Sequence, residues 1–187
     1  MKCSIIILAG GGSIRMGEDK GLMPFNGKPM IQHLIDRFMN VVTEIIIVTN
    51  NEKYKQFKCN VIQDNYPNHG PLSGIEAGLS ISKTEQNIIL SCDNPFVDLS
   101  LIEYLSIQNN NSDILFTFFK TSNPFPGLYS KSICPKLNTL INKNVKKVSA
   151  LKEYFNVNEL DCGDFNELNF INFNSPSDIE NWHENKH

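Results

Sequence analysis

Four short runs of apolar residues dominate the first half of the chain. They lie at residues 5–8, 44–49, 60–64 and 87–93. Their apolar residues are continuous rather than alternating and are mostly β-branched, which is typical of strands buried on both faces of a parallel sheet. Between these runs, residues 28–42 and 71–81 carry apolar or small residues at helical spacing, and residues 51–57 form a short polar helix. The face of the segment 28–42 that we expect to be buried consists of Ile31, Leu34, Ile35, Phe38 and Val42.

The second half of the chain is less regular but continues the same alternation. Helices are predicted at residues 98–107, 132–143 and 147–155, and a strand at 113–119. Residues 169–174, "NFINFN", alternate and are predicted as a strand, after which residues 175–182 begin a helix with Ser175 as its cap. No linker or repeat divides the chain. We therefore expect a single α/β domain over residues 1–187, a Rossmann-like three-layer sandwich whose mostly parallel sheet has helices on both faces.

Composition narrows the class of protein. The chain is 41% hydrophobic and 20% charged, which is ordinary for a globular protein. Its net charge is −3, so a general electrostatic attraction to nucleic acid is excluded. The apolar run at residues 5–9 is shorter than the roughly 7 to 15 residues of a signal peptide, and no stretch approaches the about 20 residues of a membrane span. The five cysteines are scattered without a CxxC pair. We expect a cytoplasmic protein with free thiols and no membrane partner.

The segment "LAGGGSIRMGEDKG", residues 8–21, carries the first candidate chemistry. Its glycines expose backbone N–H groups that can surround a phosphate, although a tight turn would also use glycines. A dinucleotide fingerprint would need glycine where Arg15 stands, and a phosphate-binding P-loop would need Lys-Ser or Lys-Thr where Glu18 and Asp19 stand. Arg15 and Lys20 are cations that could hold phosphate oxygens as charge develops during transfer.

Polar side chains follow the predicted strands at the sheet edge where ligands bind in parallel α/β folds. Asn50 comes directly after a predicted strand, and Asp64 and Asp93 stand at the ends of theirs. Because Asn and Asp also favour turns and caps, each of these positions has a structural alternative. The sequence around the histidines does not suggest acid–base chemistry: His33 lies in the first predicted helix, His69 precedes "GPLSG", and His183 and His187 are expected to be tail residues.

The glycine loop resembles the signature of nucleotidyltransferases, and most closely that of the molybdenum cofactor guanylyltransferases. The likeness continues through "DKGLMPFNGKPMIQH", "GPLSGIEAGL", "SCDNPF" and "FINFNSP", and so covers nearly the whole chain. It implies the fold of the nucleotide-diphospho-sugar transferases, with a nucleotide-binding half at about residues 1–100 and an acceptor-binding half at about 101–187. It also implies transfer of GMP from GTP to the terminal phosphate of molybdopterin or the molybdenum cofactor, with release of pyrophosphate.

The resemblance also assigns roles residue by residue. Arg15, Lys20 and Asp93 would be catalytic, and Asp93 would bind Mg²⁺, a hard cation that prefers carboxylate and phosphate oxygens. Asp19 is expected to orient a cation or the loop itself, and Asn172 and Asn174 to contact the acceptor. The nucleotide would be contacted by Leu8, Ala9, Gly10, Gly11, Lys20, Asn50, Asp64 and Asp93.

One departure from the family pattern concerns the acceptor side. Family members often carry a His-Pro pair before the Gly-Leu-Tyr segment, and Asn123 stands where that histidine would be. The implied partners are GTP and molybdopterin or the molybdenum cofactor, together with a transient protein that delivers or receives the cofactor. Three alternatives stay open: a cytidylyltransferase acting on the same pterin, which Gly11 disfavours; transfer to a phosphorylated sugar or isoprenoid precursor; and a nucleotide-binding module without catalysis.

Overall fold

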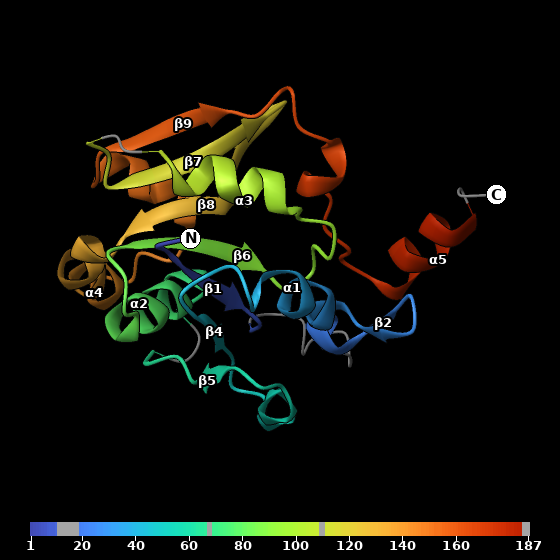
Figure 1. The fold of residues 1–187 in the computed structure, drawn as a ribbon. Helices are drawn as coiled ribbons and strands as arrows, with labels where there is room; N and C mark the ends of the chain where they lie inside the picture. Colours follow the sequence, from blue (N-terminus) through green and yellow to red (C-terminus); the bar gives the residue numbers. More distant parts are fainter. Residues whose placement is uncertain (11–18, 67–68, 109–110, 185–187) are drawn as a thin grey trace.

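A mostly parallel sheet of seven strands forms the centre of the protein (Figure 1). The computed structural model describes residues 1–10, 19–66, 69–108 and 111–184. The strands lie in the order β5-β4-β1-β6-β8-β7-β9, and β8 runs antiparallel to both of its neighbours. The single α/β fold predicted from the sequence is confirmed. Strand bounds are Ser4–Leu8 (β1), Ile45–Val48 (β4), Asn60–Ile62 (β5), Gln86–Ser91 (β6), Ile114–Phe119 (β7), Thr121–Ser130 (β8) and Val157–Asp161 (β9).

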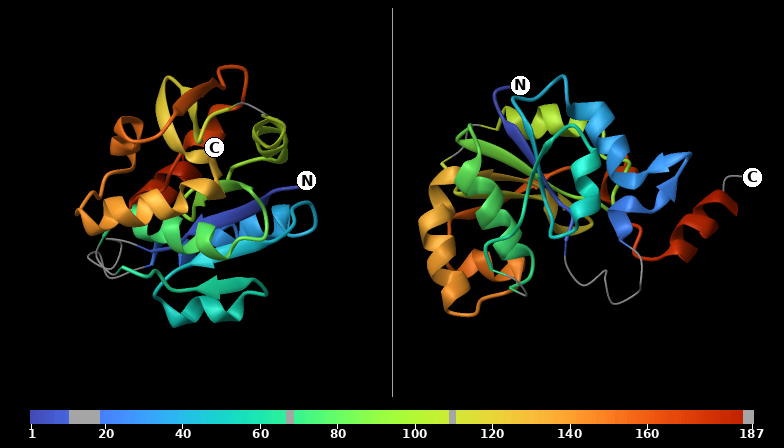
Figure 2. Two further views of the ribbon diagram at one scale, coloured as in Figure 1. Left: turned by 90° about the vertical axis from the view of Figure 1, so that its left-hand side faces the viewer. Right: turned by 90° about the horizontal axis from the view of Figure 1, so that it is seen from below.

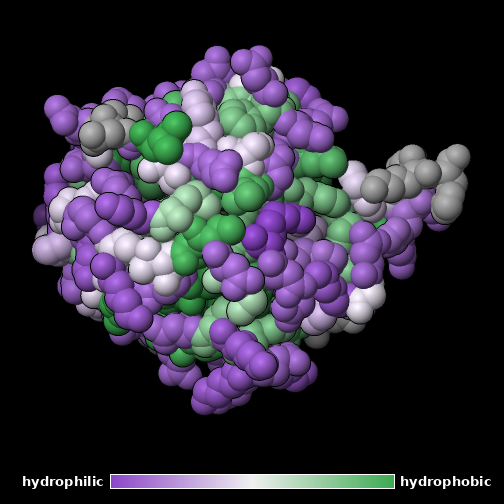
Figure 3. Space-filling model, viewed as in Figure 1, coloured by the Kyte–Doolittle hydropathy of each residue, from purple (hydrophilic) through white to green (hydrophobic). Residues whose placement is uncertain are grey.

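Two pairs of helices cover the two faces of the sheet (Figures 1 and 2). On one face α1 (Met30–Phe38) and α3 (Leu99–Ser106) pack with Ile5 and Ile7; on the other α2 (Pro71–Ile81) and α4 (Cys134–Asn142) pack with Ile6 and Leu8. Successive side chains of a strand point to opposite faces, so β1 contributes to both cores. The view in Figure 3 shows hydrophilic residues around smaller hydrophobic patches. In the described part of the chain, no helix has the length and apolar character needed to cross a membrane.

A third, smaller core joins the C-terminal helix to a short hairpin. The hairpin consists of β2 (Pro24–Phe25) and β3 (Lys28–Pro29), and α5 (Pro176–Glu184) lies beside it at the right of Figure 1. Phe25, Phe96, Phe173 and Trp182 pack edge to face or tilted, with ring centroids 4.6 to 6.0 Å apart. The prediction that His183 is a tail residue is wrong, because its ring stacks on Phe25 at 5.7 Å.

Several sequence predictions fail where the chain lacks regular periodicity. Residues 169–174 are not a strand: a 3₁₀ helix, η6 (Glu167–Phe170), ends there, and the Phe173 N–H donates to the carbonyl of Asp93 at 2.8 Å instead of to a sheet neighbour. The predicted helices at 51–57 and 147–155 are 3₁₀ helices, η3 (Glu52–Gln56) and η5 (Val148–Glu153). The edge strand β9 was not predicted, since three of its five residues are polar and it has no continuous apolar run. The remaining 3₁₀ helices are η2 (Lys20–Leu22) and η4 (Lys131–Ile133).

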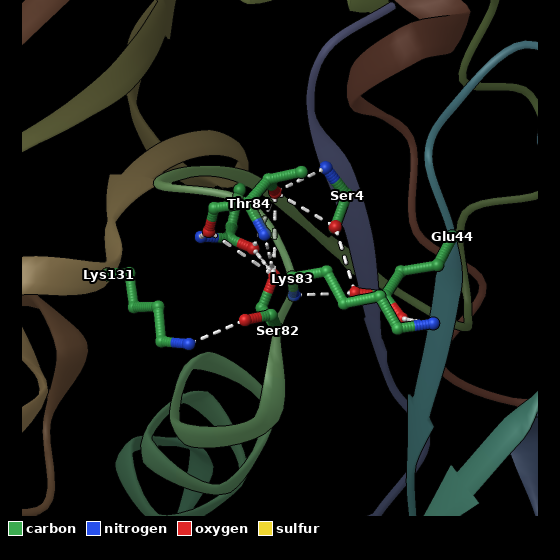
Figure 4. A network of polar contacts seen from close by, with 7 residues as sticks. Ser4, Glu44, Ser82, Lys83, Thr84 and Lys131 are labelled. Atoms are coloured by element: carbon green, nitrogen blue, oxygen red, sulfur yellow. Dashed lines mark hydrogen bonds and ion pairs between the residues drawn. The ribbon is translucent and has the colours of Figure 1, made fainter.

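Polar side chains close the edge of the sheet at the amino ends of β1 and β6 (Figure 4). The Ser4 N–H donates to Thr84 Oγ1 at 2.9 Å, and Ser4 Oγ donates to Glu44 Oε1 at 3.2 Å. The Lys83 N–H donates to the same Glu44 oxygen at 2.7 Å, and Lys131 Nζ donates to the carbonyl of Ser82. These groups satisfy one another within the fold, so this network serves the structure rather than a ligand.

The close approach of α2 to β1 requires a glycine and gives a first prediction. A Cβ atom on Gly78 would lie 2.6 Å from Cγ2 of the buried Ile6. Gly78→Ala should therefore lower the free energy of unfolding by about 1 kcal/mol. Overpacking costs about 1–3 kcal/mol, and the higher helix propensity of alanine stabilises the helix by at most about 1 kcal/mol. Urea denaturation measures this, with the exposed Ser80→Ala in the same helix as control. A Gly78→Ala variant as stable as the wild type would contradict the packing.

Candidate active site

The carboxyl ends of four parallel strands meet at one edge of the sheet. Leu8 at the end of β1 pairs with Val48 of β4 and Ser91 of β6, and Val48 pairs with Ile62 of β5. This register places the residues that follow the strands next to one another. Those residues include Gly10, Asn50, Asp64 and Asp93, so the edge predicted from the sequence is present in the fold.

Lys20 and Asp93, more than seventy residues apart in sequence, form the centre of this edge. The Lys20 ammonium lies 3.4 Å from Asp93 Oδ2 and donates a hydrogen bond to Asn174 Oδ1 at 2.8 Å. The second oxygen of Asp93 accepts a hydrogen bond from Ser91 Oγ at 2.5 Å. Both side chains are mostly covered yet still reach solvent, with 21% of Lys20 and 12% of Asp93 exposed. A cation and a carboxylate of this kind can engage a phosphate and a metal ion together.

Asp19 holds the chain from which Lys20 projects. Its carboxylate accepts hydrogen bonds from the Tyr54 hydroxyl, from Asn51 Nδ2 at 2.8 Å and from the Gly21 N–H at 3.2 Å. Gly21 has no room for a side chain, since a Cβ there would lie 2.3 Å from the Tyr54 oxygen. These contacts fix the described backbone at residues 19–21, on the C-terminal side of the glycine-rich segment. Tyr54 and Asn51 were not predicted, because only the fold brings η3 against this segment.

A second set of hydrogen bonds fixes the segment that follows Asp93. The buried Asn169 accepts from the Asp98 N–H at 2.8 Å through Oδ1, and its backbone carbonyl accepts from Asn94 Nδ2 at 2.6 Å. From α1, Arg37 Nη1 donates to the carbonyl of Pro95 at 3.0 Å. Sequence analysis missed Asn169 and Arg37. In an asparagine-rich chain nothing marks Asn169 as different from the other asparagines. Arg37 lies on α1, far in sequence from the segment after Asp93 that it supports.

Asn50 and Asp64 form a second polar pair at the same edge. Asn50 Nδ2 donates to Asp64 Oδ2 at 3.3 Å. The other oxygen of Asp64 is buried and has no hydrogen-bond partner among the described residues. A buried carboxylate oxygen without a donor is costly, so this oxygen is suited to accept a hydrogen bond from a ligand.

The remaining predicted residues differ in how far the structure describes them. Gly10 is exposed, whereas the Ala9 N–H already donates to the carbonyl of Val48 at 2.9 Å, and the Leu8 carbonyl accepts from the Cys92 N–H at 3.1 Å. Gly11 and Arg15 lie outside the described residues. Asn172 is exposed and near Asn174 in sequence, but it does not share a strand with it.

Other polar residues considered in the sequence are engaged elsewhere. Asn123 Nδ2 donates to the carbonyl of Thr121 at 2.8 Å, at the start of β8. His33 Nε2 lies 2.8 Å from the Phe25 carbonyl, and the ring of His69 packs edge to face against Tyr66. His33 therefore packs against the hairpin, and His69 packs in the segment that precedes α2.

The buried hydroxyl of Tyr54 gives a prediction about pH. Burial first, and then the nearby Cys92 and Asp19, raise the pKa of Tyr54 far above its ordinary value of 10. A pKa raised by folding contributes stability that is complete below pH about 10 and is lost as the pH rises further, by up to about 1.4 kcal/mol per pH unit. Tyr54→Phe should therefore lose less stability than the wild type between pH 9 and 11.

Urea unfolding at both pH values measures this difference. Tyr154→Phe, which removes a phenol at the surface, is the matched control. Equal losses in Tyr54→Phe and the wild type would contradict the buried role of the Tyr54 hydroxyl.

Comparison with known proteins places the chain in a family. Residues 5–157 match the family model described as the MobA-like NTP transferase domain. The chain is 34% identical to the molybdenum cofactor guanylyltransferase of Vibrio cholerae, covering 94% of this chain and 89% of that protein. It is 30% identical to the probable molybdenum cofactor guanylyltransferase of Carboxydothermus hydrogenoformans, covering 95% and 93%.

A solved structure agrees at the level of the fold. The crystal structure of molybdopterin-guanine dinucleotide biosynthesis protein A from Archaeoglobus fulgidus superposes with a TM-score of 0.83, at 22% identity over 98% of both chains. The chain therefore belongs to the family of MobA-like NTP transferase domains, which are nucleotidyltransferases.

Proposed function

We propose that this protein transfers GMP from GTP to the terminal phosphate of molybdopterin or of the molybdenum cofactor. The products are the guanine dinucleotide of the cofactor and pyrophosphate. The observation that carries the proposal is the contact of Lys20 with Asp93 and Asn174 at the carboxyl ends of β1 and β6. The names of the relatives, which specify guanylyl transfer to the molybdenum cofactor, support this choice of substrates.

The nucleotide side of the site extends from β1 to β5. Gly10 offers exposed backbone next to the start of the glycine-rich loop, and Lys20 at the far end of that loop would meet the phosphates. Arg15 and Gly11, on the loop between them, would add a cation and a further backbone donor. Asn50 and Asp64 would contact the nucleoside, and the Asp64 oxygen that no described residue binds suits a hydroxyl or amino donor there.

The acceptor side needs no general base. A phosphate monoester has a second pKa of about 6, so the attacking phosphate oxygen is already ionised at neutral pH. This oxygen would attack the α-phosphorus of GTP and displace pyrophosphate. The work of the protein is then to align two anions and to neutralise the charge that develops, which Lys20 is placed to do. Asn172 and Asn174 would lie on the side of the acceptor, and a delivering protein would approach from there.

Asp93 fits the role of a magnesium ligand. Mg²⁺ is held in nucleotide enzymes by one or two carboxylates together with phosphate oxygens, and it does not require a cage of protein ligands. Within the described ranges no group of three or more His, Cys, Asp or Glu side chains converges on one point, which is compatible with an ion held by one or two carboxylates together with phosphates. The ion would supply charge neutralisation at the α-phosphate, while Ser91 orients the carboxylate.

Product analysis tests the proposed reaction. The purified protein with Mg²⁺ and molybdopterin should form the guanine dinucleotide and pyrophosphate from GTP and form no product from CTP. Chromatography of the released pterin and a pyrophosphate assay measure both products. Product from CTP alone would overturn the choice of base. Nucleotide binding without product would point to another phosphorylated acceptor or to a binding module.

Asp93→Ala tests the metal-binding carboxylate. We expect kcat/KM to fall by at least about a hundredfold, comparable to the removal of one charge-stabilising group from an active site. Magnesium titration of the activity provides the measurement, and the apparent affinity for Mg²⁺ should fall as well. Asp36→Ala is the matched control, since it removes an exposed carboxylate on α1 that pairs with Lys28. An Asp93→Ala variant with unchanged magnesium dependence would contradict this role.

A further inference from the structure

The first turn of α5 is hydrogen-bonded to the residue that contacts Lys20. Asp178 Oδ2 accepts from the Ser175 N–H at 2.9 Å, and Ser175 Oγ accepts in return from the Asp178 N–H at 3.3 Å. This reciprocal pair is a capping box. Asp178 Oδ2 also accepts from the Asn174 N–H at 2.6 Å, one residue before the box. Capping of α5 alone does not require this additional bond.

Asn174 is therefore held from both sides. On its C-terminal side the Asp178 carboxylate fixes its backbone N–H. On its N-terminal side Phe173 is buried in the aromatic cluster of the hairpin, and the Phe173 N–H donates to the carbonyl of Asp93 at 2.8 Å. With the backbone fixed at both ends, the exposed Asn174 side chain turns toward the sheet edge and accepts from Lys20 Nζ at 2.8 Å.

We propose that Asp178 is a positioning residue for Lys20, acting through Asn174. The proposal rests on the proposed function only in that Lys20 is taken to meet the phosphates of the nucleotide. The C-terminal helix thereby has a part in the reaction although it lies outside the main sheet and packs on the hairpin (Figure 1). Asn174, expected from the sequence to contact the acceptor, has the additional task of fixing the orientation of the Lys20 ammonium.

The charge of Asp178 suits this role. Above all the hydrogen bond from the Asn174 N–H, and in addition those from Ser175, lower the pKa of the Asp178 carboxyl below its ordinary value. The carboxylate is therefore ionised at neutral pH, and hydrogen bonds to an ionised acceptor are shorter and stronger than neutral ones. A neutral acceptor at this position would hold Asn174 less firmly.

Kinetics on a double-mutant cycle test the proposal. Asp178→Ala and Asn174→Ala should each lower kcat/KM for GTP by about tenfold or more, and the double variant should be no slower than Asn174→Ala alone, because Asp178 acts on Lys20 through Asn174. Asp178→Asn, which keeps an acceptor oxygen but loses the negative charge, should recover part of the loss. Ser175→Ala is the matched control: it weakens the same helix end but leaves the bond from Asn174 to Asp178, and it should retain wild-type kinetics. Additive losses of about a hundredfold, or equal losses in Ser175→Ala and Asp178→Ala, would overturn the proposal.

A measurement without substrates separates this proposal from the proposed function. The ¹³Cε resonance of Lys20 in the folded, isotopically labelled protein reports the surroundings of its ammonium. This resonance should shift in the same direction in Asp178→Ala and Asn174→Ala and should stay in place in Ser175→Ala. An unchanged resonance in Asp178→Ala would overturn the positioning role even if the enzyme is active. If GTP and molybdopterin give no product, the same shift would still support the positioning of Lys20, and only the proposed reaction would fail.

Discussion

Parallel pairing of β1 with β4 on one side and β6 on the other is the constraint on which the site depends. It brings the ends of strands that are forty to eighty residues apart in sequence into one row, at the level of Leu8, Val48 and Ser91. Continuous burial on both faces holds this register, because the isoleucines of β1 pack with both pairs of helices. A slip of one residue would exchange the two faces of β1 and separate Asp93 from the loop that carries Lys20.

Lys20 itself is not on the sheet, so its place has to be set by other contacts. The Asp19 carboxylate, bound by Tyr54, Asn51 and the Gly21 N–H, fixes the backbone before and after it. Asn174 and Asp93 fix the ammonium group at the other end of the side chain. A lysine has four rotatable bonds and much conformational entropy to lose, and this double restraint is a physical reason why it can be ready before a ligand arrives.

The hairpin and α5 extend this support into the C-terminal part of the chain. Phe25 and Phe96 come from the first hundred residues, and Phe173 and Trp182 from the last twenty, yet the four rings form one cluster. The segment around Asn174 is anchored on this cluster and also on the carbonyl of Asp93. The N-terminal and C-terminal parts of the chain are thus joined through an aromatic core that lies beside the main sheet.

The sequence by itself determined the α/β fold and the four strands of the first half with the helices between them, because continuous apolar runs and helical spacing are local signals. Three of these strands are buried as expected, whereas β5 lies at the edge of the sheet and is partly exposed. It also offered Lys20, at the end of the glycine-rich segment, and Asp93, after a buried strand, as candidates, and the family resemblance assigned them to the phosphates and the metal ion. Only the tertiary structure decided that residues 171–174 lie outside the sheet and that β9 pairs at its edge. It also decided that Tyr54, Asn169 and Asp178 support the site. These outcomes depend on hydrogen bonds and ring contacts between distant parts of the chain, and such partners leave no periodic trace around the residue itself.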